Sequence, residues 1–294
     1  DQVEDLDFAI NRSVREIEGI DTEVINRIYE NANGVEVEQV FPKQELKGNN
    51  YYVLKNGNAS VLACYDPVRR VIRKVEKPNV FGIYPKNAEQ AFAVDALLNP
   101  NIQLVAISGK AGTGKTLLAL ASALQQNKQY EFIYLARPIV ALSSKDLGFL
   151  PGDVNEKVDP YMQPLYDNLG FIKRRFNIHG AENRLIEEMQ KEQKLMISAL
   201  AYIRGRSLSD VYFIVDEAQN LTPHEVKTII TRAGEGTKMV FTGDIDQIDS
   251  PYLDKKSNGL SHLFDKMQGQ DIFAHVHLEK GERSKLADLA SDLL

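Results

Sequence analysis

The chain has 294 residues, of which 43% are hydrophobic, and a formal net charge of −6. This size and apolar content predict one large folded domain with a smaller one, and no apolar run reaches the length of about 18 residues that a membrane span needs. The single cysteine, Cys64, excludes an internal disulfide and suits a reducing cytoplasm. The acidic balance excludes a globally basic nucleic-acid-binding surface, although a local basic patch stays open.

Residues 1–34 predict a lead-in followed by a short helix. Residues 1–20 open with several acids, so we expect them to be solvated or weakly ordered. Asp21 or Thr22 is a suitable cap for a helix that ends near Asn33.

Residues 35–77 predict a small antiparallel β module. Residues 35–40 alternate between apolar and polar, and the sequence 55–58 (Lys-Asn-Gly-Asn) is a hairpin turn between two β-rich runs. The sequence Lys-Pro-Asn at 77–79 is a plausible boundary to the next domain.

Residues 78–294 predict an α/β domain with a mostly parallel sheet and helices on both faces, because strand and helix patterns alternate along this part of the chain. The predicted strands are 104–108, 131–136, 195–200, 211–215, 238–242 and 272–278. The predicted helices are 87–98, 114–126, 182–193, 223–233, 258–267 and 283–294. Residues 138–170, rich in Gly and Pro, predict a long irregular insert, and such inserts are usually functional or mobile.

A phosphate-binding P-loop of the form G-x-x-x-x-G-K-[ST] lies between a predicted strand and a predicted helix. Its residues and the one after it are Gly109, Lys110, Ala111, Gly112, Thr113, Gly114, Lys115, Thr116 and Leu117. Backbone N–H groups of such a loop and the start of the helix attract phosphate. Lys115 is expected to contact the β- and γ-phosphates of ATP, and the Thr116 hydroxyl is expected to hold Mg²⁺. The alternative is a glycine-rich turn that matches by chance.

Two acids follow the apolar run 211–215, at the end of a strand where ligands bind in an open α/β sheet. Hydrolysis of a nucleoside triphosphate needs one acid for the metal and one to accept a proton from water. Asp216 suits the metal and Glu217 the water. An acidic pair facing solvent is the alternative.

The strand 238–242 leads into the sequence Gly-Asp-Ile-Asp-Gln at 243–247. Gln247 is expected to bond the γ-phosphate and to report its loss, and Asp244 is expected near the metal or a nucleic acid. Two alternatives stay open: a two-metal nuclease centre made by Asp244, Asp246 and Asp249, or a polar turn without a role.

These three segments together resemble motifs I, II and III of superfamily 1 helicases. Gln90, at the start of the predicted helix 87–98, resembles the glutamine with which that superfamily reads adenine, and an amide edge can donate and accept at once. The alternative is a surface helix residue.

A closer resemblance, to PhoH-like proteins, covers most of residues 80–294. It rests on the segments 137–138, 147–153, 156–161, 164–167, 204–206 and 216–220. The resemblance implies a RecA-like P-loop ATPase that unwinds or moves along RNA, assembled as a homo-hexameric ring. It also implies a PIN nuclease domain upstream of Asp1, joined to the ATPase by a β module such as 35–77. Superfamily 1 helicases have two RecA-like domains, whereas this chain has room for one, so a neighbouring subunit is expected to complete the site.

An arginine is expected to stabilise charge on the transferred phosphoryl group. Arg283, in Glu-Arg-Ser at 282–284, resembles the arginine of a helicase motif and would act in cis. Arg137, Arg204 and Arg206 are further candidates, in cis or across an interface. For each, a surface salt bridge is the alternative.

Candidate contacts to single-stranded nucleic acid fall into two clusters. The basic residues of the β module are Arg69, Arg70, Arg73 and Lys74, and those after the insert are Lys173, Arg174 and Arg175. The aromatic residues that we expect to stack on bases are Tyr51, Tyr52 and Tyr65. The alternative is that these clusters are ordinary solvated faces. The sequence thus predicts a Mg²⁺-dependent ATPase coupled to RNA or another single strand. A small-molecule kinase and a nucleotide-switched binding module are the rivals.

Overall fold

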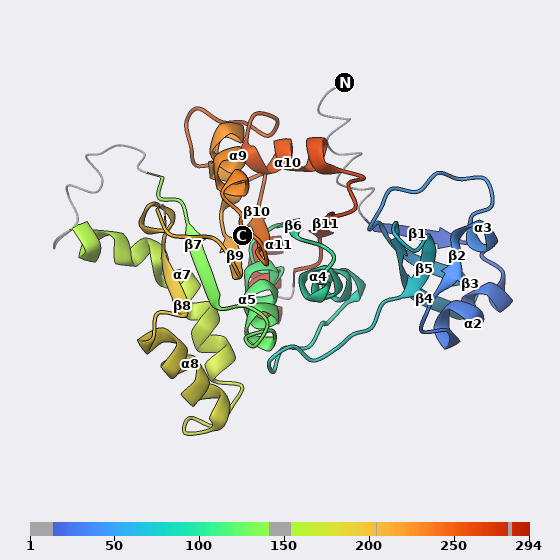
Figure 1. The fold of residues 1–294 in the computed structure, drawn as a ribbon, viewed down its shortest axis with the longest axis horizontal. Helices are drawn as coiled ribbons and strands as arrows, with labels where there is room; N and C mark the ends of the chain where they lie inside the picture. Colours follow the sequence, from blue (N-terminus) through green and yellow to red (C-terminus); the bar gives the residue numbers. More distant parts are fainter. Residues whose placement is uncertain (1–13, 141–153, 204, 282–283) are drawn as a thin grey trace.

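The computed structural model describes residues 14–140, 154–203, 205–281 and 284–294. They form two sheets, one of five strands and one of six, and the five-stranded sheet lies at one side of the six-stranded one (Figure 1). Across these residues, each helix is too short or too polar to cross a membrane.

The five-stranded sheet has the strand order β1-β3-β4-β5-β2. Its strands are β1 (Val14–Glu18), β2 (Val35–Glu36), β3 (Tyr51–Asn56), β4 (Ala59–Asp66) and β5 (Val71–Lys74), and helices α2 (Thr22–Glu30) and α3 (Val37–Val40) pack on it. The antiparallel pairs β3–β4, β4–β5 and β2–β5 agree with the predicted module.

Two local predictions in this module are wrong. Residues 14–18, expected as a weakly ordered lead-in, form β1, which pairs in parallel with β3. A parallel partner distant in the sequence leaves no turn signal beside the strand, so the pairing is not visible locally. Residues 37–40, expected to continue an alternating strand, form the single helical turn α3, because Val37 and Val40 are three positions apart and both are buried in the module's core. Residues 1–13 lie outside the described residues.

The six-stranded sheet confirms the predicted α/β domain and is parallel throughout. Its order is β11-β6-β10-β9-β7-β8. The strands are β6 (Leu104–Gly109), β7 (Phe132–Arg137), β8 (Leu195–Ala199), β9 (Val211–Val215), β10 (Lys238–Gly243) and β11 (Phe273–Leu278). The strand before the P-loop is therefore separated by β10 alone from the strand that ends at the acidic pair.

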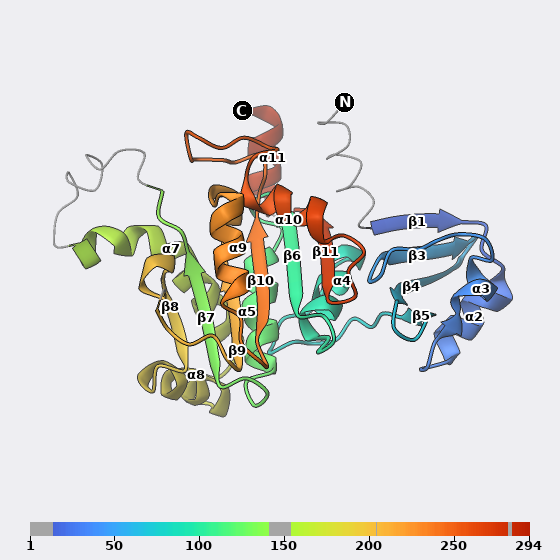
Figure 2. The same cartoon turned by 45° about the horizontal axis from the view of Figure 1, so that its top comes forward.

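Helices cover both faces of this sheet (Figure 2). One core contains α4 (Ala88–Leu98), α5 (Lys115–Gln125), α7 (Val154–Lys173) and α8 (Ala181–Lys191), and the other contains α9 (Pro223–Thr231) and α10 (Gly259–Met267); α11 (Lys285–Leu293) ends the chain. Successive side chains of a strand alternate between the two cores, so that Val105 faces the first and Leu104 the second.

The prediction of an irregular insert is wrong for residues 154–170. They belong to helix α7, although Pro160 and Pro164 lie within it. Proline inside a helix removes a backbone donor and is costly. Met162, Leu165 and Leu169 repeat at helical spacing and are at most 3% exposed, so burial against the sheet outweighs that cost. The segment 141–153 lies outside the described residues.

Side chains of the β module attach it to helix α4 and to the start of β11. Arg73 donates to both carboxylate oxygens of Asp95, each at 2.8 Å, and the Tyr51 hydroxyl donates to Asp95 Oδ2, also at 2.8 Å. Asn49 Nδ2 donates to the backbone oxygens of Asp271 and Phe273. The module is thus fixed to the helix whose first turn reaches the P-loop.

A candidate P-loop nucleotide site

The P-loop joins β6 to α5 and turns tightly enough to require glycine. Gly112 and Gly114 have φ angles of 82° and 88°, in the left-handed region that glycine favours. A Cβ atom at Gly109 would lie 2.6 Å from the backbone oxygen of Leu278. The loop ends at the N-terminus of α5, where unpaired N–H groups and the helix dipole favour an anion.

Side chains of the loop reach back to its first turn. The Thr113 hydroxyl donates to the backbone oxygen of Lys110 at 2.8 Å, and Lys115 Nζ donates to the same oxygen at 3.2 Å. Lys115 is only 8% exposed and lines a cavity. Its ammonium group is therefore held at the place where the phosphates of a nucleotide would lie.

Asp216 accepts hydrogen bonds from hydroxyl groups on two neighbouring elements. Thr116 Oγ1 and Thr242 Oγ1 donate to Asp216 Oδ1 at 2.8 and 2.7 Å. Hydroxyl and carboxylate oxygens suit Mg²⁺, which usually keeps several waters and needs one or two protein carboxylates. The predicted metal ligands Thr116 and Asp216 are thus brought together, and Thr242 is a partner that sequence reasoning missed.

Arg137, at the end of β7, faces the same carboxylate. Its Nε and Nη2 donate to Asp216 Oδ2 at 3.1 and 2.7 Å, and Nη2 lies 4.0 Å from Glu217 Oε1. Nη1 donates to the backbone oxygen of Tyr161 in α7 at 3.3 Å. The guanidinium group therefore joins the acidic pair to α7 and presents a positive charge beside the P-loop.

Glu217 has a backbone conformation that few residues adopt, with φ at 56° in the left-handed region. Burial raises the pKa of its carboxyl group, and the nearby Asp216 charge raises it further. Gln219 Nε2 donates to Glu217 Oε2 at 2.7 Å and to the backbone oxygen of Gln247 at 3.1 Å, and Gln219 Oε1 accepts from Asp244 N at 3.1 Å. Gln219 thus connects the acid to the loop after β10.

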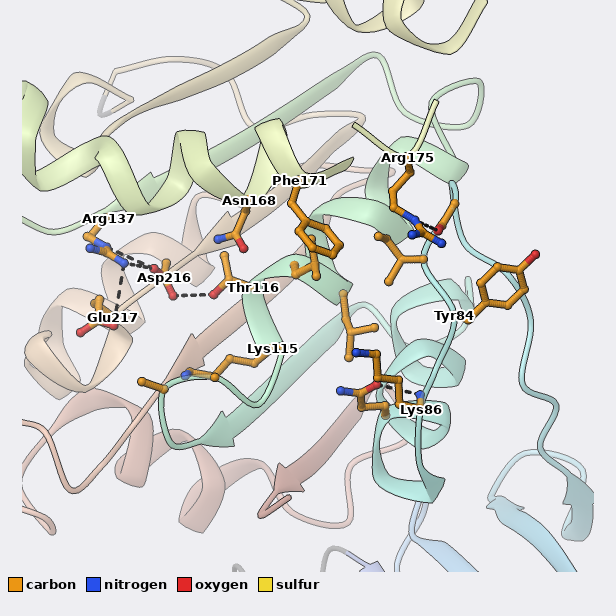
Figure 3. Close-up of a pocket in the computed structure, with 18 residues that line it drawn as sticks. Tyr84, Lys86, Lys115, Thr116, Arg137, Asn168, Phe171, Arg175, Asp216 and Glu217 are labelled. Carbon is orange, nitrogen blue, oxygen red and sulfur yellow. Dashed lines mark hydrogen bonds and ion pairs between the residues drawn. The ribbon is translucent and has the colours of Figure 1, made fainter. Parts of the chain in front are cut away.

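A cavity of about 540 Å³ extends from these groups along the P-loop (Figure 3). Lys115, Thr116, Arg137, Asp216 and Glu217 line one part of it. Further lining residues are Gly82, Ile83, Tyr84, Lys86, Gln90, Leu117, Leu118, Asn168, Phe171 and Arg175, of which Tyr84, Phe171 and Arg175 lie away from the acidic pair (Figure 3). This volume is within the range of small-ligand pockets. Sequence reasoning missed Asn168 and Phe171, because α7 was not expected as a helix, and it missed Tyr84, which lies in the segment before α4 and carries no motif.

Gln90 lies at the cavity but has backbone partners at both ends of its amide. Its Oε1 accepts from Lys86 N at 2.9 Å, and its Nε2 donates to Thr113 O, in the P-loop, at 3.0 Å. The alternative of a surface helix residue is wrong, since Gln90 is 5% exposed. Its role toward adenine stays a prediction.

Gln247 is exposed and does not line the cavity; its backbone oxygen, rather than its side chain, contacts Gln219. Its role as a sensor stays a prediction. Within the described ranges, no group of three His, Cys, Asp or Glu side chains could hold a metal ion, so the alternative of a nuclease centre at Asp244, Asp246 and Asp249 has no support.

Among the remaining arginine candidates, Arg206 does not line the cavity. Arg283 and Arg204 lie outside the described residues. Arg206 is exposed, and its backbone oxygen accepts from Arg232 Nη2.

The prediction that tyrosines of the module stack on the bases of a single strand is wrong, because Tyr51, Tyr52 and Tyr65 are at most 6% exposed. The basic residues of the module have partners as well. Arg73 pairs with Asp95, Arg70 with Glu38, Arg69 with the backbone oxygen of Asn33, and Lys74 with Glu76 and the ring of Tyr29. After the insert, Arg175 Nε donates to the backbone oxygen of Gly82.

Comparisons with known proteins identify the family of this chain. The sequence model of the family described as "PhoH-like protein" matches residues 82–292. "Protein PhoH2" of Bacillus subtilis (strain 168) is 46% identical over 254 residues, which are 84% of this chain and 56% of that protein. "Protein PhoH2" of Mycolicibacterium smegmatis is 34% identical over 244 residues, 82% of this chain and 54% of that protein. The chain spans about half the length of these relatives.

Among solved structures, Pif1 helicase from Candida albicans aligns with 70% of this chain and 42% of its own, at 18% identity and a TM-score of 0.36. The family match covers the P-loop, the acidic pair and helix α7 alike. The chain belongs to the PhoH-like protein family, and it is a nucleotide-binding P-loop protein.

Proposed function

We propose that this chain hydrolyses ATP with Mg²⁺ and couples hydrolysis to binding and movement on RNA or another single strand. The observation that carries the proposal is the convergence of the Thr116 hydroxyl, Asp216 and Glu217 at one part of the P-loop cavity. A nucleotide-binding site needs the first two groups, whereas a third, partly buried acid with a raised pKa suits a proton acceptor.

Each residue then has a defined task. The loop amides and Lys115 bind the phosphates, and Thr116 and Asp216 would hold Mg²⁺, which supplies charge stabilisation at the phosphate oxygens. Glu217 accepts a proton from the attacking water while Gln219 fixes its orientation. Arg137 is placed to stabilise charge on the transferred group, a task worth roughly 10³-fold or more in rate.

Coupling to a nucleic acid is supported by the path from Glu217 through Gln219 to the loop 244–247. A shift of Glu217 after hydrolysis would change the bonds that Gln219 makes to that loop, whose residue Gln247 is exposed. The helicase-like motifs favour a single strand as the partner. We further propose a homo-oligomeric ring in which a neighbouring subunit completes the site, with a nuclease domain in the longer protein.

The test is ATP turnover by the chain with and without single-stranded RNA, with Lys115→Ala as control. We expect turnover that rises with RNA and is lost in the variant. Basal turnover without any response to RNA or DNA would contradict the coupling. Phosphate transfer to a small molecule would indicate the kinase, and nucleotide binding without turnover would indicate the switched binding module.

A further inference from the structure

We propose that the site holds the base of its nucleotide by stacking on Phe171 in an apolar subsite and does not read the base edge with Gln90. It therefore accepts adenine and guanine nucleotides alike. This inference rests on the proposed function, because it takes the triphosphate to be bound at the P-loop.

The position of the subsite follows from the direction of the cavity. Lys115, Asp216 and Glu217 lie together in one part of it, while Phe171, Arg175 and Tyr84 lie in the other (Figure 3). With the phosphates at the P-loop and the hydrolytic groups beyond them, the base extends toward the second part.

Phe171 projects from α7 into this part of the cavity (Figure 3). It is 44% exposed, so much of its ring is open to a ligand. Ile83, Leu117 and Leu118 are aliphatic residues that line the same cavity. A flat base with apolar faces fits an aromatic ring with aliphatic neighbours, and stacking of this kind tolerates every base because each has a π-face.

The turn at residues 80–83 lines the cavity beside the end of α7 and is held in place from two sides. Backbone bonds join Val80 N to Ile83 O at 2.8 Å and Ile83 N to Val80 O at 2.9 Å. Arg175, two residues after the end of α7, donates from its Nε to Gly82 O at 3.1 Å. Gln125 Oε1 of α5 accepts from Phe81 N at 2.9 Å. The subsite is therefore largely formed before a ligand arrives, which lowers the entropic cost of binding.

Gln90 is engaged elsewhere. Its amide oxygen and nitrogen bond Lys86 N and Thr113 O, and 5% exposure leaves little of it for a ligand. A site discriminates strongly between related ligands when fixed polar groups would be left unpaired by the wrong one. Tyr84, Lys86 and Arg175 also line the cavity but are exposed, and Asn168 is half-buried with its Nδ2 donating to the backbone oxygen of Pro164 at 3.2 Å. Away from the acidic pair and the P-loop, Gln90 is therefore the one buried polar side chain among the described lining residues, and its amide is engaged at both ends. Gln90 is a positioning residue of the P-loop.

The test measures binding of non-hydrolysable ATP and GTP analogues, and of inorganic triphosphate, to the whole chain with Mg²⁺. We expect both analogues to bind within a few-fold of one another. Phe171→Ala should weaken both by roughly tenfold and leave triphosphate binding unchanged, whereas Phe171→Tyr should retain affinity. Gln90→Ala should weaken all three ligands by the same factor, because it acts through the loop.

Tyr166→Ala is the matched control. Tyr166 lies on the same helix, is 42% exposed and does not line the cavity, so its loss reports any general effect of loosening α7. Equal ATP binding by wild type and Phe171→Ala would overturn the inference. So would a preference for ATP above a hundredfold that Gln90→Ala abolishes. Both results would leave the proposed function standing, whereas wild-type protein that binds neither analogue nor triphosphate would refute both.

Discussion

The two sheets use charged and aromatic side chains in opposite ways. In the five-stranded module, Arg73 and Tyr51 point at Asp95 of the neighbouring domain, and Tyr52 is 1% exposed in the module's own core. In the six-stranded sheet, Arg137 and Asp216 lie at strand ends and face an open cavity. A basic and aromatic cluster in the sequence thus does not by itself indicate a binding surface.

The difference has a physical cause. Helices cover both faces of a parallel sheet, so its strands are apolar within and polar groups gather where the strands end. A small sheet buries too little apolar surface to stand alone easily, and its polar groups help to attach it to a larger neighbour. Residues of the module should therefore affect stability, and residues at the strand ends should affect turnover.

Glu217→Gln is expected to give the largest effect. The amide keeps the shape of the side chain but cannot accept the proton, so ATP turnover should fall by about 10²–10³-fold. Nucleotide affinity and the thermal midpoint should change little. Steady-state turnover, analogue binding and thermal unfolding of the same preparation check this. A variant that loses stability but keeps its turnover would break the contrast between the sheets.

Arg73→Ala should destabilise the protein by about 3 kcal/mol. The change leaves Asp95 largely buried without its cation, and breaking such a pair is costly. Urea unfolding measures the effect, with Arg69→Ala as an exposed control on the same module. If Arg73→Ala instead weakened binding of single-stranded RNA while the unfolding midpoint stayed constant, Arg73 would belong to a binding surface after all.

Lys238 is an ionisable residue that is buried in the parallel sheet and does not line the cavity. Its Nζ donates to the backbone oxygens of Ala96 and Asn99, and burial lowers the pKa of Lys238 to about 7. Above that pH the unfolded chain binds one proton more than the folded chain, up to the ordinary lysine pKa. The free energy of unfolding should therefore gain up to about 1.4 kcal/mol per pH unit from this group between pH 7 and 8.5.

Urea midpoints at pH 7.0, 7.75 and 8.5 test this prediction. Lys238→Met should remove this contribution, although it also removes the Nζ donor from Ala96 O and from Asn99 O, of which Asn99 O keeps Ile102 N, and lowers stability at every pH. An unchanged pH slope in the variant would show that Lys238 stays charged when folded, despite its burial.

Arg70→Ala should have the smallest effect. Its ion pair with Glu38 is exposed, with side chains 66% and 58% accessible, and such pairs contribute little. We expect no resolvable change in the urea midpoint and unchanged affinity for single-stranded RNA. Filter binding at low salt is the sensitive measurement. A clear loss of RNA affinity would assign the module a nucleic-acid face that its paired residues argue against.

The sequence by itself determined the alternating strands and helices of the parallel sheet, the P-loop and the acidic pair at a strand end. These features are local: hydrophobic period marks each element, and the glycines and Lys115 mark the turn. Predictions from the same local patterns were wrong where a residue distant in the sequence determines the secondary structure. Residues 14–18 become a strand only because β3 is beside them, and α7 is helical despite two prolines because its apolar side is buried.

Only the tertiary structure decided which side chains meet. In the folded chain Tyr51 and Arg73 bond Asp95, and Gln90 donates to the P-loop. Phe171 of α7 lines the cavity beside that loop. A residue's type sets which bonds it can make, but its partner depends on how layers pack. That packing is fixed by burial summed over the whole chain, which a motif of a few residues does not contain.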